Sequence, residues 1–238
     1  MLGGISWLRA GVRRNPDHCG QPQHECSVLW LYLPPIRILK DKPKIMGEQA
    51  LANQTYETYL ALEAESDTKY EYHDGFIVAM AGGTPAHSQL GANVVTELNL
   101  ALRKKGGSCR VYNSDLKVRI ESVNRTYYPD ASVGCEEPVY SSKDGNALTN
   151  PILIVEVLSH SNEAFDRGSR FYNYRRLPSL QEYLLISQDD VMVDISYRTE
   201  EDVWETRVVK GLDGKLKLRS LGCEIGLAEL YRLVPGLG

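Results

Sequence analysis

Two carboxylates stand inside apolar stretches that are each typical of a buried β-strand. Asp130 lies in "YYPDASV" and Glu156 lies in "LIVEVLS". Burial of an ionised carboxylate is costly unless a partner compensates it, and two close carboxylates also repel each other. A hard cation such as Mg²⁺ relieves both costs, because it binds one or two carboxylates and keeps several waters. The pair therefore indicates a Mg²⁺ site, with Mn²⁺ as the other candidate ion, and chemistry on a phosphoryl group.

Three further side chains can complete such a site, although each also has an ordinary structural interpretation. Arg170 in "DRGSRFYNY" can stabilise negative charge, but a pKa above about 12 prevents it from acting as a general base. Lys117 in "SDLKVRI" reaches Asp130 only if the strands pair in a suitable register, and otherwise it is a solvated edge lysine. Glu71 is either a third carboxylate of the site or an exposed hairpin residue. For Asp130 and Glu156 themselves, the alternative is an ion pair with an arginine or a capping role.

Hydrophobic periodicity and turn signals predict the elements that hold these residues. Thr55 is a candidate cap for a first helix, and Asp74-Gly75 indicates a hairpin. The clearest helix begins at Thr84-Pro85 and ends at Gly106-Gly107. The remaining expected elements are strands over 109–120, 127–135 and 152–158, a helix over 166–177, a strand in "QEYLLIS", an antiparallel pair in "VMVDISYRT" and "WETRVVKG", and a short helix in "GLAELYRLV". This order predicts a mixed α/β (α+β) domain.

Composition is that of an ordinary globular protein, with 42% apolar and 24% charged residues. The net charge of −4 provides no global basic field, so any contact with nucleic acid needs a local cluster of Arg and Lys. Five irregularly spaced cysteines favour a reducing compartment over a disulfide framework, and Cys135 is interpreted as a small hydrophobe. The apolar run over residues 28–33 is too short to span a bilayer. We therefore expect a cytoplasmic protein without a membrane partner.

The first 45 residues mix Gly, Arg, Pro, His and Cys without helical or strand periodicity. We expect residues 1–45 to be a loosely ordered extension, or a segment upstream of a natural start at Met46. Residues 46–238 are expected to form a single domain.

Several segments together resemble one protein family. They are "KYEYHDGFIVAMAGGTPAH", "SDLKVRI", "YYPDASVGC", "ILIVEVLSHS" and "DRGSRFYNYRRLPSLQEYLLISQD", in this order. Over roughly residues 50 to 234 the chain is similar to the Uma-type family, whose members are proposed restriction endonucleases of the restriction-endonuclease-like, or PD-(D/E)XK, superfamily. The resemblance implies an αβββαβ core, Mg²⁺-dependent cleavage of a phosphodiester bond, and a bacterial, often cyanobacterial, origin.

The active-site pattern of this superfamily is Pro-Asp, a gap, then Glu or Asp, one residue, and Lys. Pro129-Asp130 match the first part and Glu156 matches the second, so the resemblance assigns both acids as metal ligands and catalytic residues. Leu158 stands where the lysine is expected. A lysine in the following helix is the suggested substitute in this family, and Arg170 occupies that position here.

Two functions stay open. The first is a Mg²⁺-dependent endonuclease acting on DNA, in which water is the nucleophile and Arg170 or Lys117 stabilises the charge of the transition state. The second is a nuclease fold that has lost catalysis and works as a nucleic-acid-binding or assembly module, which the missing lysine favours. A glycosidase pair of acids is a weaker third reading. A homodimer is expected by analogy, because many restriction-type nucleases cut two strands with two subunits.

One helix offers candidate contacts to phosphates. It carries Arg167, Arg170, Arg175 and Arg176 among aromatic residues. Such arginines neutralise phosphates, although an amphipathic helix packed on the sheet explains them equally well. His87, in the first turn of the main helix, is interpreted as a polar residue of the helix end.

Overall fold

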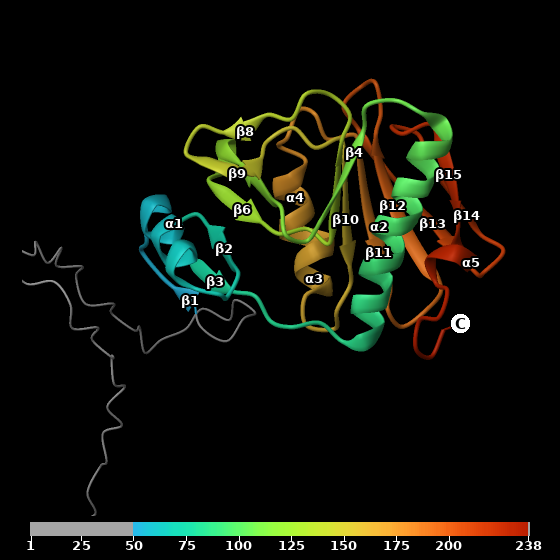
Figure 1. Cartoon of the computed structure of the whole chain (residues 1–238), viewed down its shortest axis with the longest axis horizontal. Helices are drawn as coiled ribbons and strands as arrows, with labels where there is room; N and C mark the ends of the chain where they lie inside the picture. Colours follow the sequence, from blue (N-terminus) through green and yellow to red (C-terminus); the bar gives the residue numbers. More distant parts are fainter. Residues whose placement is uncertain (1–49, 238) are drawn as a thin grey trace, which may run out of the picture. The chain divides into compact units, whose positions relative to one another are not determined.

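A computed structural model describes residues 50–237 of the chain (Figure 1). The expectations for residues 1–45 and for Met46 concern residues outside this range. Within the described range no helix is both long and apolar enough to cross a membrane.

The central feature of the fold is a six-stranded sheet with the order β13-β12-β11-β10-β7-β4. Only β10 and β11 run parallel, and the other neighbours are antiparallel. The strands are β4 (Arg110–Asn113), β7 (Ala131–Gly134), β10 (Leu153–Val157), β11 (Glu182–Ile186), β12 (Met192–Arg198) and β13 (Trp204–Lys210).

A second, seven-stranded sheet has the order β1-β3-β2-β6-β5-β9-β8, and β14 pairs with β15. The strands of the seven-stranded sheet are β1 (Ala50–Leu51), β2 (Tyr70–His73), β3 (Ile77–Ala79), β5 (Lys117–Ile120), β6 (Arg125–Tyr127), β8 (Tyr140–Ser141) and β9 (Asp144–Leu148). The separate pair is β14 (Lys215–Leu218) and β15 (Cys223–Gly226). The helices are α1 (Tyr56–Glu65), α2 (Pro85–Lys105), a 3₁₀ turn (Glu121–Val123), α3 (Glu163–Phe165), a π-helical turn (Asp166–Arg170), α4 (Phe171–Tyr174) and α5 (Leu227–Leu230).

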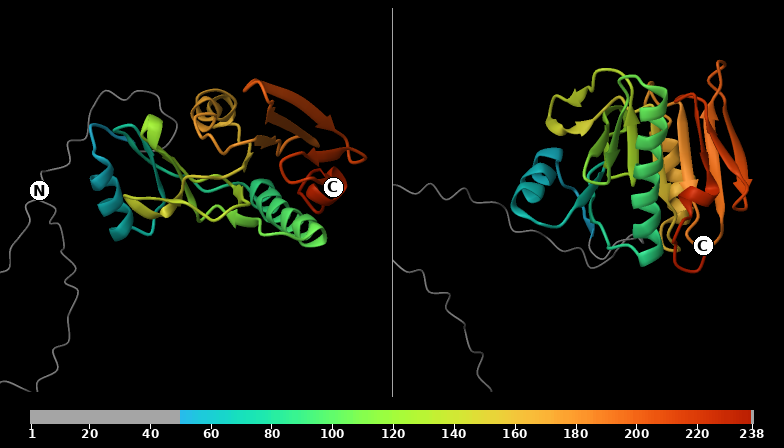
Figure 2. Two further views of the ribbon diagram at one scale, coloured as in Figure 1. Left: turned by 90° about the horizontal axis from the view of Figure 1, so that it is seen from above. Right: turned by 45° about the vertical axis from the view of Figure 1, so that its right-hand side comes forward.

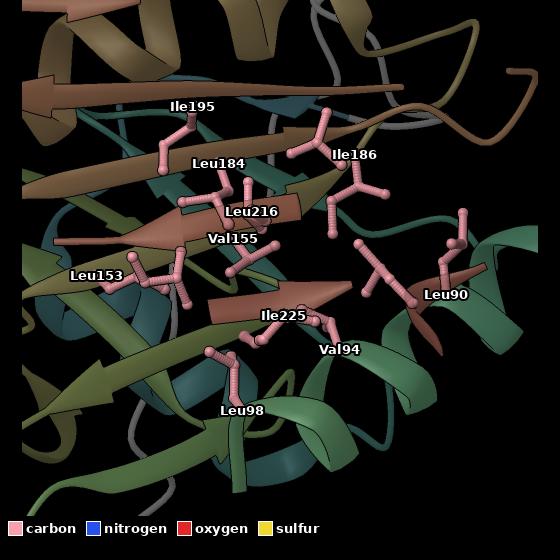
Figure 3. Close-up of a cluster of buried hydrophobic side chains, with 14 of the residues drawn as sticks. Leu90, Val94, Leu98, Leu153, Val155, Leu184, Ile186, Ile195, Leu216 and Ile225 are labelled. Carbon is pink, nitrogen blue, oxygen red and sulfur yellow. The ribbon is translucent and has the colours of Figure 1, made fainter. Parts of the chain in front are cut away.

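Helix α2 covers one face of the six-stranded sheet, and α5 lies beside it (Figure 2). It begins as predicted, because the Thr84 hydroxyl accepts a hydrogen bond from the main-chain N–H of His87 at 3.1 Å. It ends at Gly106, whose φ of 76° favours glycine. The buried stripe Leu90, Val94 and Leu98 packs on Leu153 and Val155 of the sheet (Figure 3).

The opposite face of the sheet carries a second core. There α4 contributes Tyr174, which packs with Ile154 of β10 and Tyr183 of β11. Because Leu153 and Val155 face α2 while Ile154 faces α4, β10 is buried on both sides, as its unbroken apolar sequence predicts.

The core order α2, β4, β7, β10, α3–α4, β11 is the predicted αβββαβ arrangement. The helix and hairpin that precede it (α1, β2, β3) and the C-terminal hairpin (β12, β13) are also confirmed. The fold class is therefore α+β with a restriction-endonuclease-like core.

Two predicted strands are wrong in extent, because each is divided between the two sheets. The strand predicted over 109–120 breaks at a turn in which the main-chain N–H of Asp115 donates to Asn113 Oδ1, and it continues as β5 in the seven-stranded sheet. The strand predicted over 127–135 breaks at Pro129, which has no N–H for a sheet ladder. Asp130 therefore lies where the chain passes from one sheet to the other, directly before β7.

The cysteine prediction is also corrected. Arg110 and Gly134 form the last residue pair of β4 and β7, and Cys109 and Cys135 lie opposite each other one residue further on. These two cysteines form a disulfide. Cys135 is thus a bonded residue and not a free small hydrophobe.

Candidate active site

Asp130 and Glu156 are brought together by the pairing of β7 with β10. The antiparallel register joins Val133 to Leu153 and Ala131 to Val155, so one further step sets Asp130 opposite Glu156. Opposite residues on antiparallel strands share a face, with Cβ atoms about 5 Å apart. Here the side chain of Asp130 takes the place of a main-chain acceptor, because its Oδ2 accepts a 2.6 Å hydrogen bond from the main-chain N–H of Val157.

Arg170 lies among three carboxylates at the same place. Its Nη1 and Nη2 donate to the two oxygens of Glu71 at 2.9 Å each, and Nη1 also donates to Glu156 Oε1 at 3.2 Å. Its Nε is 2.9 Å from Asp166 Oδ1. The Arg170 side chain is only 7% exposed, so these ion pairs are formed away from bulk water. Glu71 is buried with it and is not an exposed hairpin residue.

Four carboxylates lie around Arg170 and are called the acidic cluster: Glu71, Asp130, Glu156 and Asp166. With one arginine among four carboxyl groups, the formal charge of this place is negative. Burial raises the pKa of Glu156 well above its ordinary value, Arg170 opposes the rise, and Asp166 and Asp130 add to it. Burial likewise raises the pKa of Asp166 to about 7 against the attraction of Arg170.

Glu71 is the exception in the acidic cluster. Burial opposes its ionisation, but the bidentate contact with Arg170 and the hydrogen bond to His73 outweigh it and lower the pKa of Glu71 to about 2. One arginine is therefore largely neutralised by Glu71, and the other carboxylates remain undercompensated.

This donor set fits a hard divalent cation. Within the described residues, no hydrogen bond or ion pair involves Asp130 Oδ1 or Glu156 Oε2, whereas Val157 and Tyr174 hold the other oxygen of each carboxylate. Two fixed carboxylates that each keep an unbonded oxygen match the way proteins bind Mg²⁺ or Mn²⁺. No group of three or more His, Cys, Asp or Glu side chains in the described part of the chain has the geometry of a complete metal site. The acids fit an ion that keeps much of its water.

Several residues at the site were not predicted as part of it. His87 Nε2 lies 3.5 Å from Asp130 Oδ2, so His87 contacts the site as well as belonging to the first turn of α2. The Tyr174 hydroxyl donates to Glu156 Oε1 at 3.0 Å, and His73 Nε2 lies 2.9 Å from Glu71 Oε2. Asp166 had a usable signal, because its i,i+4 spacing to Arg170 is that of a helical ion pair. The contacts of His87 and Tyr174 depend on tertiary packing and leave no comparable signal.

The expectation for Lys117 is not met. Its ammonium lies 2.8 Å from Glu63 Oε2 of α1 and 2.7 Å from Asp144 Oδ2 of β9, a strand of the seven-stranded sheet. None of the described interactions joins it to Asp130 or Glu156. The break at Asn113–Asp115 is the reason, since it removes β5 from the sheet that carries β7. Lys117 instead borders a separate cleft of about 430 Å³, which Glu63 and Tyr128 also line.

The remaining basic residues are distributed differently from the prediction. Arg170 is buried in the acidic cluster and is not available on the helix surface. Arg167 is engaged with Glu163 and Asp194, while Arg175 and Arg176 are exposed. Leu158, at the expected lysine position, is buried in the core beneath α4.

Comparison with known proteins places this chain in a family. Residues 56–228 match the Uma2 family, described as "Putative restriction endonuclease", and the chain belongs to that family. Two relatives come from Synechocystis sp. (strain ATCC 27184 / PCC 6803 / Kazusa). The uncharacterized protein slr1290 is 38% identical over 74% of this chain and 90% of its own length. The uncharacterized protein sll1609 is 33% identical over 67% of this chain and 89% of its own length.

A solved structure has the same fold. It is a crystal structure described as a "putative nuclease belonging to DUF820" from Anabaena variabilis ATCC 29413. It matches with a TM-score of 0.57 and 17% identity, over 70% of this chain and 91% of the other. At this identity the match establishes the fold, and it agrees with the restriction-endonuclease-like core described above.

Proposed function

We propose that this protein is a Mg²⁺-dependent endonuclease that hydrolyses phosphodiester bonds of DNA. The observation that carries the proposal is the β7–β10 register, which sets Asp130 opposite Glu156 inside an acidic cluster with one arginine. Membership of the Uma2 family and the nuclease description of the Anabaena structure support the same class of enzyme.

In this proposal Asp130 and Glu156 would hold the metal, and each has one oxygen without another described contact. A bound Mg²⁺ would supply an activated water and neutralise charge on the phosphate. The second oxygen of each carboxylate is fixed by a neighbour, Asp130 by the Val157 N–H and Glu156 by the Tyr174 hydroxyl. These bonds orient the free oxygens before the ion arrives, which lowers the cost of binding it.

Arg170 acts in this proposal as a positioning residue. The contacts of its guanidinium run to Glu71, Glu156 and Asp166, so it holds the carboxylates in place and limits their repulsion. It is permanently protonated, because the surrounding carboxylates more than offset the effect of burial on its pKa. A base for the attacking water therefore has to come from another group or from solvent.

One observation favours the second function, a catalytically inactive nucleic-acid-binding or assembly module. Leu158 replaces the lysine, and among the described residues no lysine or arginine other than Arg170 is paired with Asp130 or Glu156. A site without a lysine or arginine side chain that is free to contact the phosphate is less able to stabilise the charge of a phosphoryl transition state.

Metal binding measured together with cleavage separates these functions. Isothermal titration with Mg²⁺ and Mn²⁺, and nicking of supercoiled plasmid, are compared for the wild type, Asp130→Asn and Glu156→Gln. The exposed acid Asp189 provides a matched control as Asp189→Asn. We expect millimolar or tighter binding and nicking in the wild type and the control, and neither in the two site variants. Metal binding without nicking indicates the inactive module, and absence of metal binding in the wild type contradicts the proposed site.

A further inference from the structure

In the part of the chain that the structure describes, strand β13 pairs only with β12 and forms a free edge of the six-stranded sheet. It lies beside β12 as the last strand of the order (Figure 1). It spans seven residues. A long edge strand presents unpaired main-chain donors and acceptors to another strand.

The alternation of hydrogen bonds along β13 shows which groups point outward. Thr199 donates to the carbonyl of Val203, and Gly211 donates to the carbonyl of Val191. These two pairs continue the β12–β13 register by one residue pair at each end of the ladder. In an antiparallel ladder hydrogen-bonded pairs alternate with non-bonded pairs. The odd-numbered residues of β13 therefore bond to β12, and Trp204, Thr206 and Val208 direct their main-chain N–H and C=O groups to the free edge.

We propose that β13 pairs with β13 of a second copy of this chain, antiparallel and with the two-fold axis at Thr206. In this register Thr206 meets Thr206 of the other copy, and the outward groups of Trp204 meet those of Val208 in both directions. The edge groups of the two copies then satisfy each other, and the two sheets join into one.

Side-chain charge selects this register. It places Glu205 opposite Arg207 of the other copy, and the two-fold axis forms that ion pair twice. Sliding one strand by two residues along the other, in either direction, keeps the main-chain bonds but sets Glu205 against Glu205, or Arg207 against Arg207. Like charges directly opposite each other on neighbouring strands are destabilising.

The exposed apolar residues favour the same register. Val208 is 52% exposed and Val203 is 56% exposed. The pairing sets Val208 against Trp204 of the other copy, and Val203 against Val209. Each exposed valine is thus covered by an apolar neighbour on its own face of the joined sheet, Val208 on one face and Val203 on the other. This is the self-complementarity that an isologous interface requires.

The test is a charge swap followed by sedimentation equilibrium of the full chain. We expect a wild-type dimer whose dissociation constant rises about tenfold in Glu205→Arg and in Arg207→Glu, because each single change creates two like-charge oppositions. Combining both changes restores opposite charges and should return the constant to near the wild-type value. As a control, Arg110→Glu reverses an exposed charge on β4, the other edge of the sheet, and should leave the dimer intact.

A backbone variant tests the pairing without changing charge. Val208→Pro removes an N–H that points to the free edge, so the chain should fold while the dimer weakens. Circular dichroism melting verifies that each variant is folded. A monomeric wild type, a dimer unaffected by the single changes, a double variant that stays dissociated, or disruption by Arg110→Glu would each overturn the proposal.

Discussion

Arg170 is the residue on which the acidic cluster depends for its stability. It is the counter-charge of three buried carboxylates, and the bidentate contact with Glu71 uses the planar guanidinium in a way that lysine does not reproduce. Arg170→Met leaves these carboxylates buried and unpaired, so we expect the free energy of unfolding at pH 7 to fall by about 3–5 kcal/mol. Arg170→Lys keeps the charge and should lose less than half of that amount.

Urea unfolding of the three proteins, followed by circular dichroism, measures this difference. The surface variant Arg176→Met is a matched control, because Arg176 is exposed and its change should cost less than about 0.5 kcal/mol. Equal stability of the Met and Lys variants at position 170 would show that charge at this position is unimportant.

Asp166 should make the protein less stable as the pH rises. Burial first, and Glu71 and Asp130 after it, raise its pKa from 3.8 to about 7 against the attraction of Arg170. A carboxyl with a raised pKa binds its proton more tightly in the folded state, so its contribution to stability is lost between pH 4 and pH 7. Glu71, with its pKa lowered to about 2, acts with the opposite sign and only below about pH 4.5.

The variant Asp166→Asn removes this titration. Its free energy of unfolding should fall less between pH 4 and pH 7 than that of the wild type, by up to about 4 kcal/mol for a shift of this size. Urea unfolding at pH 4, 5.5 and 7 in the presence of a chelator provides the comparison. Parallel pH profiles for the two proteins would contradict the raised pKa.

At the scale of elements, the sequence predicts what is governed by local signals. The Thr84 cap, Pro85 and Gly106 define the ends of α2, and the apolar run of β10 indicates a strand covered on both faces. The divided strands were missed because their apolar pattern continues across the break, and sheet membership is decided by tertiary pairing. That same break separates Lys117 from Asp130, so the error in the element produced the error in the site.

The position of β5 therefore leads to a prediction about Lys117. This lysine compensates the buried carboxylate of Asp144 and the half-buried carboxylate of Glu63, and none of its described ion pairs is with the acidic cluster. Lys117→Met should reduce the free energy of unfolding by about 3 kcal/mol while the affinity for Mg²⁺ stays unchanged. Denaturation and metal titration of the same sample measure both quantities. A parallel loss of metal affinity in a folded variant would place Lys117 functionally in the Asp130–Glu156 site.

At the scale of the whole molecule, the charge distribution opposes the proposed substrate. The chain has a net charge of −4, and the acidic cluster concentrates carboxylates where the scissile phosphate has to approach. Each unit charge about 8 Å from a phosphate costs roughly 0.5 kcal/mol in water. The bound metal ion is thus required for substrate affinity as well as for chemistry, if the proposed function is correct.

This repulsion predicts an increase in affinity from variants that abolish cleavage. In a chelator, and at a pH at which both carboxylates of the wild type are ionised, Asp130→Asn combined with Glu156→Gln should bind DNA about fivefold more tightly than the wild type, because two negative charges are removed from the approach path. The gain should shrink between 50 and 200 mM salt, since salt screens charges that are open to solvent. Fluorescence anisotropy with a labelled duplex measures both effects, and Asp189→Asn controls for the loss of an acid elsewhere. Unchanged affinity in the double variant would mean that DNA does not approach Asp130 and Glu156, and the nuclease proposal would then lose its physical basis.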